Sequence, residues 1–137
     1  KMGCIPVVNE NDSVEVVEIK FGDNDTLSAI VADCIRADML ILLTDIDALY
    51  DGDPRKNPNA KKIEVVETIS AEIESLAGAA GSDRGTGGMA TKIAAAKIAT
   101  EKGITVAIGS GKDPDIIYDF IDGKNPGTVF KAKGVAL

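Results

Sequence analysis

A glycine-rich loop that leads into a helix is the strongest chemical feature of this sequence. Five glycines occur between positions 78 and 88, and the segment Gly85-Thr86-Gly87-Gly88-Met89-Ala90-Thr91-Lys92 runs into an alanine-rich stretch. Glycines let a backbone approach an anion closely, and the N–H groups and dipole at a helix N-terminus favour negative charge. The pattern therefore predicts a phosphate-binding loop, with Lys92 one turn into the helix as a further contact. A glycine linker between two helices is the alternative.

This loop differs from two familiar phosphate-binding motifs. A Walker A loop needs Lys and then Ser or Thr directly after its last glycine, whereas Gly88 is followed by Met89. The spacing Gly85-x-Gly87-x-x-Ala90 has the form of a dinucleotide fingerprint. However, a predicted helix precedes it, and no acidic residue ends the strand that follows.

Carboxylate and amide side chains gather in three predicted loops. They are Asn9, Asn11 and Asp12, then Asp23, Asn24 and Asp25, then Thr44, Asp45 and Asp47. Acidic loops are usually solvated surface. Two of these loops, however, follow predicted buried strands, and open α/β sheets bind ligands at the carboxyl ends of their strands. We therefore expect these groups to orient a lysine, a Mg²⁺ ion or a substrate ammonium group. An EF-hand is excluded, because Leu49 occupies a ligand position in the register that starts at Asp45.

The absence of histidine narrows the chemistry further. The 137 residues include 22 acidic and 15 basic side chains and no histidine, for a net charge of −7. This excludes Ser-His-Asp and Cys-His nucleophile pairs and histidine-containing zinc sites. Phosphoryl transfer fits the remaining groups, because it depends on positioning and charge neutralisation more than on covalent chemistry.

Charge and hydropathy also bear on partners and location. The Lys and Arg residues form no run clear of acidic neighbours, which argues against a nucleic-acid partner. The longest apolar run, 39–43, is too short to span a bilayer, so we expect no membrane partner and a cytoplasmic protein. Cys4 and Cys34 are widely spaced single thiols, and we expect both to be buried in the core.

The elements that must position these groups alternate between strand and helix. Strand character is predicted at 5–8, 14–21, 39–43, 63–66, 105–108 and 128–131, and helices are predicted at 26–36, 70–77, 89–102 and 113–121. This alternation predicts an α/β fold with a mainly parallel sheet, in which 39–43 is buried on both faces. The first helix would bury a stripe of apolar residues, namely Leu27, Ile30, Val31, Cys34 and Ile35.

Five segments together resemble the amino acid kinase family, and within it the glutamate 5-kinases. They are Gly3-x-Ile5-Pro6-Val7-Val8-Asn9-Glu10-Asn11-Asp12, Phe21-Gly22-Asp23-Asn24-Asp25-Thr26-Leu27-Ser28-Ala29, Leu42-Leu43-Thr44-Asp45, Leu49-Tyr50 with Asp53-Pro54-Arg55, and Gly85 to Lys92. The resemblance covers essentially the whole chain. It implies a three-layer α/β/α sandwich that lacks its N-terminal part, with residues 1–137 as a single partial domain, the C-terminal, ATP-binding half.

The resemblance also implies a reaction. It is the ATP- and Mg²⁺-dependent phosphorylation of the γ-carboxylate of L-glutamate to γ-glutamyl phosphate, the first step of proline biosynthesis. The implied partners are L-glutamate, further copies of the chain in a homo-oligomer, and glutamate-5-semialdehyde dehydrogenase through functional coupling. We expect no useful activity from this chain alone. Two alternatives stay open: a non-catalytic nucleotide-binding module, and a family member with another acceptor.

The resemblance assigns roles to individual residues. Lys92 and Asp25 are similar to the catalytic lysine and to the carboxylate that orients such lysines. Substrate binding is implied for Asp12, Asn24 and Asp23, the last with a capping role as the alternative. ATP binding is implied for Thr44 and Asp45 and for the loop residues Thr86, Gly87, Gly88, Met89, Ala90, Thr91 and Lys92. No residue is assigned as a metal ligand. Tyr50 and Asp53 either border the nucleotide or form a structural turn.

Overall fold

A four-stranded sheet with helices on both faces organises this protein. The computed structural model describes residues 3–9, 24–54, 56–79 and 88–134. Its elements, in chain order, are α1 (Asn24–Ile35), β1 (Met39–Thr44), β2 (Leu49–Tyr50), β3 (Lys62–Ile63), β4 (Val65–Val66), α2 (Ala71–Ala79), α3 (Met89–Glu101), β5 (Thr105–Ser110), α4 (Ile116–Ile121) and β6 (Thr128–Phe130). The main sheet has the order β1-β5-β6-β4, and β2 and β3 form a separate two-stranded sheet.

The main sheet is mainly parallel, as the alternation of elements predicts. β1 pairs with β5 and β4 pairs with β6 in parallel, and only β5 and β6 are antiparallel. The register of β1 and β5 places Thr44 opposite Ser110, so the two strands end together. The carboxyl ends of these strands therefore form one edge, the edge at which α/β sheets bind ligands.

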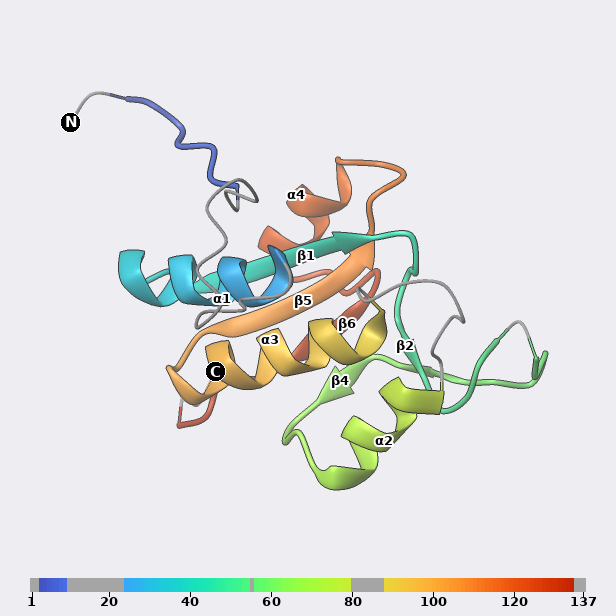
Figure 1. The fold of residues 1–137 in the computed structure, drawn as a ribbon. Helices are drawn as coiled ribbons and strands as arrows, with labels where there is room; N and C mark the ends of the chain where they lie inside the picture. Colours follow the sequence, from blue (N-terminus) through green and yellow to red (C-terminus); the bar gives the residue numbers. More distant parts are fainter. Residues whose placement is uncertain (1–2, 10–23, 55, 80–87, 135–137) are drawn as a thin grey trace.

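The residues of β5 alternate between the two helical layers. Val106 and Ile108 belong to the core cluster that contains the buried residues of α1 and α3. Gly109 faces the other way, because a Cβ built there would lie 2.8 Å from Ile116 Cδ1 of α4. In Figure 1, α1 and α3 lie side by side on one face of the sheet and α4 lies behind it. The three-layer α/β/α arrangement is confirmed.

The helices around the sheet begin and end at local signals. Ser70 Oγ accepts a hydrogen bond from Ile73 N at 3.4 Å at the start of α2. Gly103, with a φ of +80°, follows the end of α3, a conformation that favours glycine. α4 begins later than predicted, at Ile116, because Asp113 first forms a turn in which its Oδ1 accepts a hydrogen bond from Asp115 N at 3.0 Å. The part of the chain that the structure describes has no helix long and apolar enough to cross a membrane.

The apolar stripe predicted for α1 is wrong in part. Its fully buried residues are Ala29 and Ala32, while Cys34 is exposed and Ile35 is 68% exposed. α1 packs beside α3, whose own buried face is rich in alanine, and small side chains allow two helices to approach closely. Close packing therefore selects the alanine face, and the face that carries Cys34 is left exposed. Cys4 is exposed as well, so the prediction of two buried cysteines is wrong.

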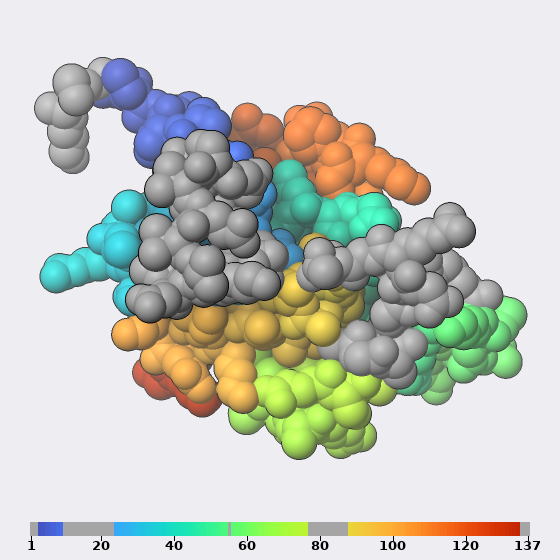
Figure 2. Space-filling model, viewed as in Figure 1, coloured from blue at the N-terminus to red at the C-terminus, as the bar shows by residue number. Residues whose placement is uncertain are grey.

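Two strand predictions also change. Residues 3–9 form no strand, and Ile5 and Val7 are more than nine-tenths exposed, because this segment lies at the periphery of the molecule (Figure 2). The strand at 39–43 exists as β1, but only Leu42 is fully buried, and Leu43 is 40% exposed. β1 is at the edge of the described sheet, so it is not covered on both faces as a central strand would be. The segment 14–21 lies outside the described residues.

The region between β1 and α2 is more structured than its turn-rich composition indicates. β2 lies within the segment predicted as a loop. The single strand predicted at 63–66 is divided at Glu64 into β3, which pairs with β2, and β4, which pairs with β6. The strands predicted at 105–108 and 128–131 are observed as β5 and β6.

Candidate functional site

A buried ion pair joins the first turns of α1 and α3. Lys92 Nζ lies 3.1 Å from Asp25 Oδ2, and the two side chains are only 10% and 19% exposed. A lysine this far buried needs an opposite charge, because an unpaired buried ammonium group is strongly disfavoured. Asp25 is also stabilised by its place in the first turn of α1, where the helix dipole favours negative charge. The structure thus brings together two residues that are 67 positions apart in the sequence.

Thr91 shares the same carboxylate oxygen. Its Oγ1 lies 2.7 Å from Asp25 Oδ2 and 2.8 Å from the carbonyl oxygen of Gly88. Asp25 Oδ2 therefore contacts both the Lys92 ammonium and the Thr91 hydroxyl, which restricts the rotation of the carboxylate. This contact of Thr91 is one that sequence reasoning missed, because the Thr91 side chain was assigned only to the phosphate loop.

The N-terminus of α3 has an open cap. Gly88 precedes the helix in an extended conformation (φ −81°, ψ −170°) and offers no side chain to cap it. The first N–H groups of a helix lack partners within the helix and can bind an anion. Lys92 lies one turn further along the same helix. The described end of the glycine loop therefore combines helix N–H groups with a buried, oriented cation.

The last residue of β1 and the loop after it carry the other predicted nucleotide residues. Thr44 Oγ1 donates a hydrogen bond to Asp45 Oδ1 at 3.0 Å. The carbonyl oxygen of Thr44 accepts one from Gly111 N at 2.7 Å, which joins this loop to the loop after β5. Both contacts fix the backbone at the carboxyl edge of the sheet.

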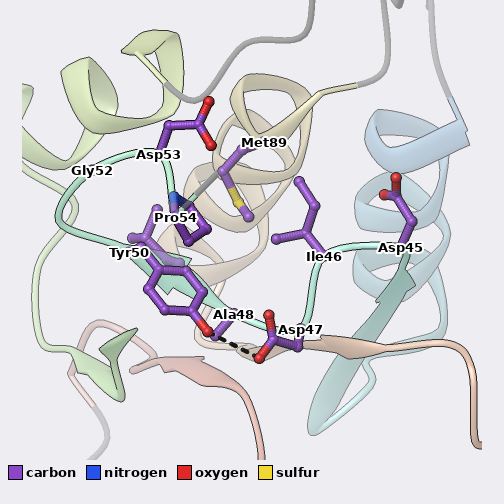
Figure 3. A pocket seen from close by; sticks show the side chains of 10 residues that line it. Asp45, Ile46, Asp47, Ala48, Tyr50, Gly52, Asp53, Pro54 and Met89 are labelled. Atoms are coloured by element: carbon purple, nitrogen blue, oxygen red, sulfur yellow. Dashed lines mark hydrogen bonds between the residues drawn. The ribbon is translucent and has the colours of Figure 1, made fainter. Parts of the chain in front are cut away.

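A cavity of about 200 Å³ opens between this loop and the start of α3. It is lined by Asp45, Ile46, Asp47, Ala48, Leu49, Tyr50, Gly52, Asp53, Pro54 and Met89. Figure 3 shows Ile46 on one side of the cavity and Tyr50 and Pro54 on the other. Met89 is the first residue of α3 and is 2% exposed, so the cavity adjoins the N-terminal end of that helix.

The rim of the cavity carries polar groups. Tyr50 Oη donates a hydrogen bond to Asp47 Oδ2 at 3.0 Å (Figure 3). Partial burial, together with this hydrogen bond and the negative charge of Asp47, raises the pKa of the Tyr50 hydroxyl above 10.0. Asp53 is buried, and its carbonyl oxygen accepts hydrogen bonds from the N–H groups of Lys56 and Asn57 at 3.0 and 2.8 Å. Asp53 thus lines the cavity and also holds a turn, so the two roles considered for it are compatible.

The remaining predicted residues divide into three groups. Asn24 is exposed at the first position of α1, next to Asp25. Ala90 faces a different groove, between α2 and α3, where Glu74 and Lys97 form an ion pair at 2.6 Å. Asp12, Asp23, Thr86 and Gly87 lie outside the described residues.

The apolar wall of the cavity could not be found from the sequence. Ile46 and Ala48 belong to no motif, and their only signal was their position in a turn-rich segment after a strand. Among residues 3–9, 24–54, 56–79 and 88–134, no three His, Cys, Asp or Glu side chains form a group that could hold a metal ion.

Comparison with known proteins places these features in a family. Residues 1–110 match the amino acid kinase family. The chain is 52% identical to glutamate 5-kinase from Clostridium perfringens over 135 residues, which are 96% of this chain and 50% of that protein. It is 56% identical to glutamate 5-kinase from Clostridium acetobutylicum over 131 residues, covering 96% of this chain and 49% of that protein. The chain thus spans about half the length of these relatives.

Solved structures agree with this assignment. Carbamate kinase from Giardia lamblia bound to AMP-PNP superposes with a TM-score of 0.58 and 27% identity, over 80% of this chain and 32% of that one. UMP kinase from Ureaplasma parvum gives a TM-score of 0.59 and 25% identity, over 81% of this chain and 43% of that one. We conclude from the family match, the shared fold and the lysine held at a helix N-terminus beside the sheet edge that the chain belongs to the amino acid kinase family.

Proposed function

We propose that this chain is the nucleotide-binding half of a kinase that transfers the γ-phosphoryl group of ATP to the γ-carboxylate of L-glutamate. The observation that carries the proposal is the Lys92 ammonium group, buried and held by Asp25 at the N-terminus of α3. Two relatives more than 50% identical to the chain are named glutamate 5-kinase, and a structural neighbour was solved with the ATP analogue AMP-PNP. The product would be γ-glutamyl phosphate, formed in the first step of proline biosynthesis.

The proposed chemistry needs no group that the chain lacks. An oxygen of the ionised γ-carboxylate attacks the γ-phosphorus, a new O–P bond forms, and the bond to the bridging oxygen breaks as ADP leaves. The attacking carboxylate has already lost its proton, so no general base is required. Lys92 stabilises the negative charge on the transferring phosphoryl group, and Asp25 keeps the ammonium group oriented. Helix N–H groups at Gly88 and beyond bind phosphate oxygens.

The cavity beside Met89 is the proposed site for the adenine and ribose. Its apolar side chains suit the faces of a base, and the carboxylates and the hydroxyl on its rim provide polar contacts. Because Met89 starts α3, a nucleotide in this cavity would direct its phosphates toward the N-terminus of that helix. Thr44 and Asp45 would border the same nucleotide.

Mg²⁺ fits this site as a partner of the nucleotide. Magnesium in kinases is held mostly by substrate phosphates, water and one or two carboxylates. Asp45 is exposed at the sheet edge and lines the cavity, so we propose it for such a contact, whereas Asp25 is engaged by Lys92 and Thr91. When bound, the ion would neutralise charge on the phosphates.

The glutamate site is proposed at the start of α1. Asn24 would bind substrate there, together with Asp12 and Asp23, which precede it in the sequence. Assembly into a homo-oligomer and coupling to glutamate-5-semialdehyde dehydrogenase stay predictions.

We expect the chain alone to bind nucleotide but not to turn over glutamate. It spans about half of its relatives, and β1 is an open edge in the described sheet. A chimaera that joins the N-terminal half of the C. perfringens relative to this chain should release ADP with glutamate and not with aspartate. Glutamate-dependent ADP release by the isolated chain would contradict the expectation.

The nucleotide site can be tested by calorimetric titration with Mg-AMP-PNP. Lys92→Met keeps the buried volume and removes the charge, so binding should weaken about 10- to 100-fold, the usual loss for a charged hydrogen bond to phosphate. Lys97→Met removes one charge from the exposed side of the same helix and should leave the affinity within twofold. Equal affinities for wild type and Lys92→Met would refute the proposed role of Lys92.

A further inference from the structure

The hydroxyl group of Thr128 joins the two sheets of the protein. Thr128 is the first residue of β6 and is fully buried. Its Oγ1 accepts a hydrogen bond from Leu49 N at 2.8 Å and donates one to the carbonyl oxygen of Ile63 at 2.7 Å. Leu49 and Ile63 are opposite each other in the β2–β3 pair. One hydroxyl thus contacts both strands of the small sheet from within the large one.

These contacts determine where one wall of the cavity lies. Leu49 and Tyr50 form β2 and line the cavity, and Met89 lines it from the N-terminus of α3. Met89 and Leu49 both pack into the main core, but the strands of the small sheet pair only with each other and with no strand of the main sheet. The distance between the two walls therefore depends in part on the polar contacts that attach the small sheet to β6.

Thr128 is itself held rigidly in place. It pairs with Ile108 of β5, and a Cβ added at the preceding residue, Gly127, would collide with the carbonyl oxygen of Ile108. The chain before β6 is thus packed directly on the centre of the sheet. Further hydrogen bonds support the same attachment. Lys62 Nζ donates to the carbonyl oxygen of Pro126 at 2.9 Å, and the carbonyl oxygen of Glu64, directly after β3, accepts from Val129 N at 2.9 Å and from Asn125 Nδ2 at 2.7 Å.

A hydroxyl is the group that these contacts require. Leu49 N needs an acceptor and the Ile63 carbonyl oxygen needs a donor, and a hydroxyl can serve both at once. Valine has the same shape but neither function, so it would leave a buried N–H and a buried C=O unsatisfied. The side chain therefore does more than fill space.

We propose that Thr128 is a positioning residue that fixes the β2 wall of the cavity relative to the N-terminus of α3 and thereby sets the affinity for the nucleotide base. This inference rests on the proposed function, because the base is taken to bind in that cavity. Thr128 itself is not among the residues that line the cavity.

The test compares three variants with wild type by Mg-AMP-PNP titration and by amide hydrogen exchange without nucleotide. Thr128→Val should weaken binding about tenfold and accelerate exchange at residues 50–53 about tenfold, with exchange in α3 unchanged. Thr128→Ser keeps the hydroxyl, so its affinity and its exchange rate at residues 50–53 should stay within twofold of the wild-type values. Thr100→Val makes the same chemical change at another buried threonine, whose hydroxyl donates to the carbonyl oxygen of Lys97 within α3, and should alter neither.

Each outcome bears on the inference. Wild-type affinity and wild-type exchange in a folded Thr128→Val variant would overturn it. If that variant does not fold, a Thr128→Ser variant with tenfold weaker binding would overturn it, and near-wild-type binding would support it. If wild type binds no AMP-PNP, the proposed function fails, and the exchange at residues 50–53 still decides whether Thr128 positions the cavity wall.

Discussion

Replacing Asp25 by asparagine should destabilise the protein by about 2–3 kcal/mol. The two charges are 3.1 Å apart, which corresponds to a gross Coulomb attraction of about 5 kcal/mol at an effective dielectric constant of about 20. Desolvation of both groups offsets part of this attraction, and removal of one partner from a buried pair costs about 3–5 kcal/mol. The expected loss lies at or just below the lower end of this range, because asparagine keeps an oxygen that can accept a hydrogen bond from Thr91.

Urea unfolding followed by circular dichroism measures this loss directly. For a domain of this size, 2–3 kcal/mol corresponds to a decrease in melting temperature of about 6–12 °C. The matched control is Asp119→Asn, which breaks an ion pair with Lys124 whose side chains are 44% and 66% exposed. An exposed pair contributes little, so the control should change the free energy of unfolding by less than about 1 kcal/mol.

A double-mutant cycle with Lys92→Met isolates the pair itself. If Asp25 and Lys92 interact as described, their coupling energy should be about 2 kcal/mol, and the double variant should be more stable than the sum of the single effects predicts. A coupling energy below about 0.5 kcal/mol, or equal losses for Asp25→Asn and Asp119→Asn, would refute the buried ion pair.

Two further predictions concern the cavity and the helix layer. The raised pKa of Tyr50 means that the folded state holds this proton more tightly than the unfolded state, so the associated stability is present below pH 10 and is lost above it. Tyr50→Phe should therefore show a smaller loss of urea resistance between pH 8 and pH 10.5 than wild type, whereas Tyr118→Phe, at a 67% exposed position, should behave like wild type. Ala96 is fully buried in α3, so Ala96→Leu should overpack the core and lower stability by about 1–3 kcal/mol. Ala94→Leu, on the exposed side of the same helix, should be near neutral, and equal melting temperatures for these two variants would contradict the described packing.

Local signals in the sequence were sufficient for the helices. α1 and α3 lie within one or two residues of the helices predicted at 26–36 and 89–102, because helical periodicity and a terminal glycine act between near neighbours. The mainly parallel sheet followed from the alternation of elements, because a helical crossover joins parallel strands. The predictions failed where burial depended on distant residues. The sequence predicts one strand that contains both Ile63 and Val65, yet Ile63 pairs with β2 in the small sheet and Val65 pairs with β6 in the main sheet.

The features of the candidate site also separate into those predicted from nearby residues and those that depend on distant contacts. From the sequence alone it follows that a glycine-rich segment leads into a helix carrying Lys92, and that Thr44 and Asp45 lie at the end of a strand, since both depend on residues close together in the chain. Its resemblance to a known family implied that Asp25 orients a lysine. The folded arrangement was needed to see that one Asp25 oxygen contacts both Lys92 and Thr91, that a cavity opens beside Met89, and that Thr128 joins the two sheets. These features depend on contacts between residues more than 30 positions apart, and such contacts exist only once the helices and the two sheets have packed together.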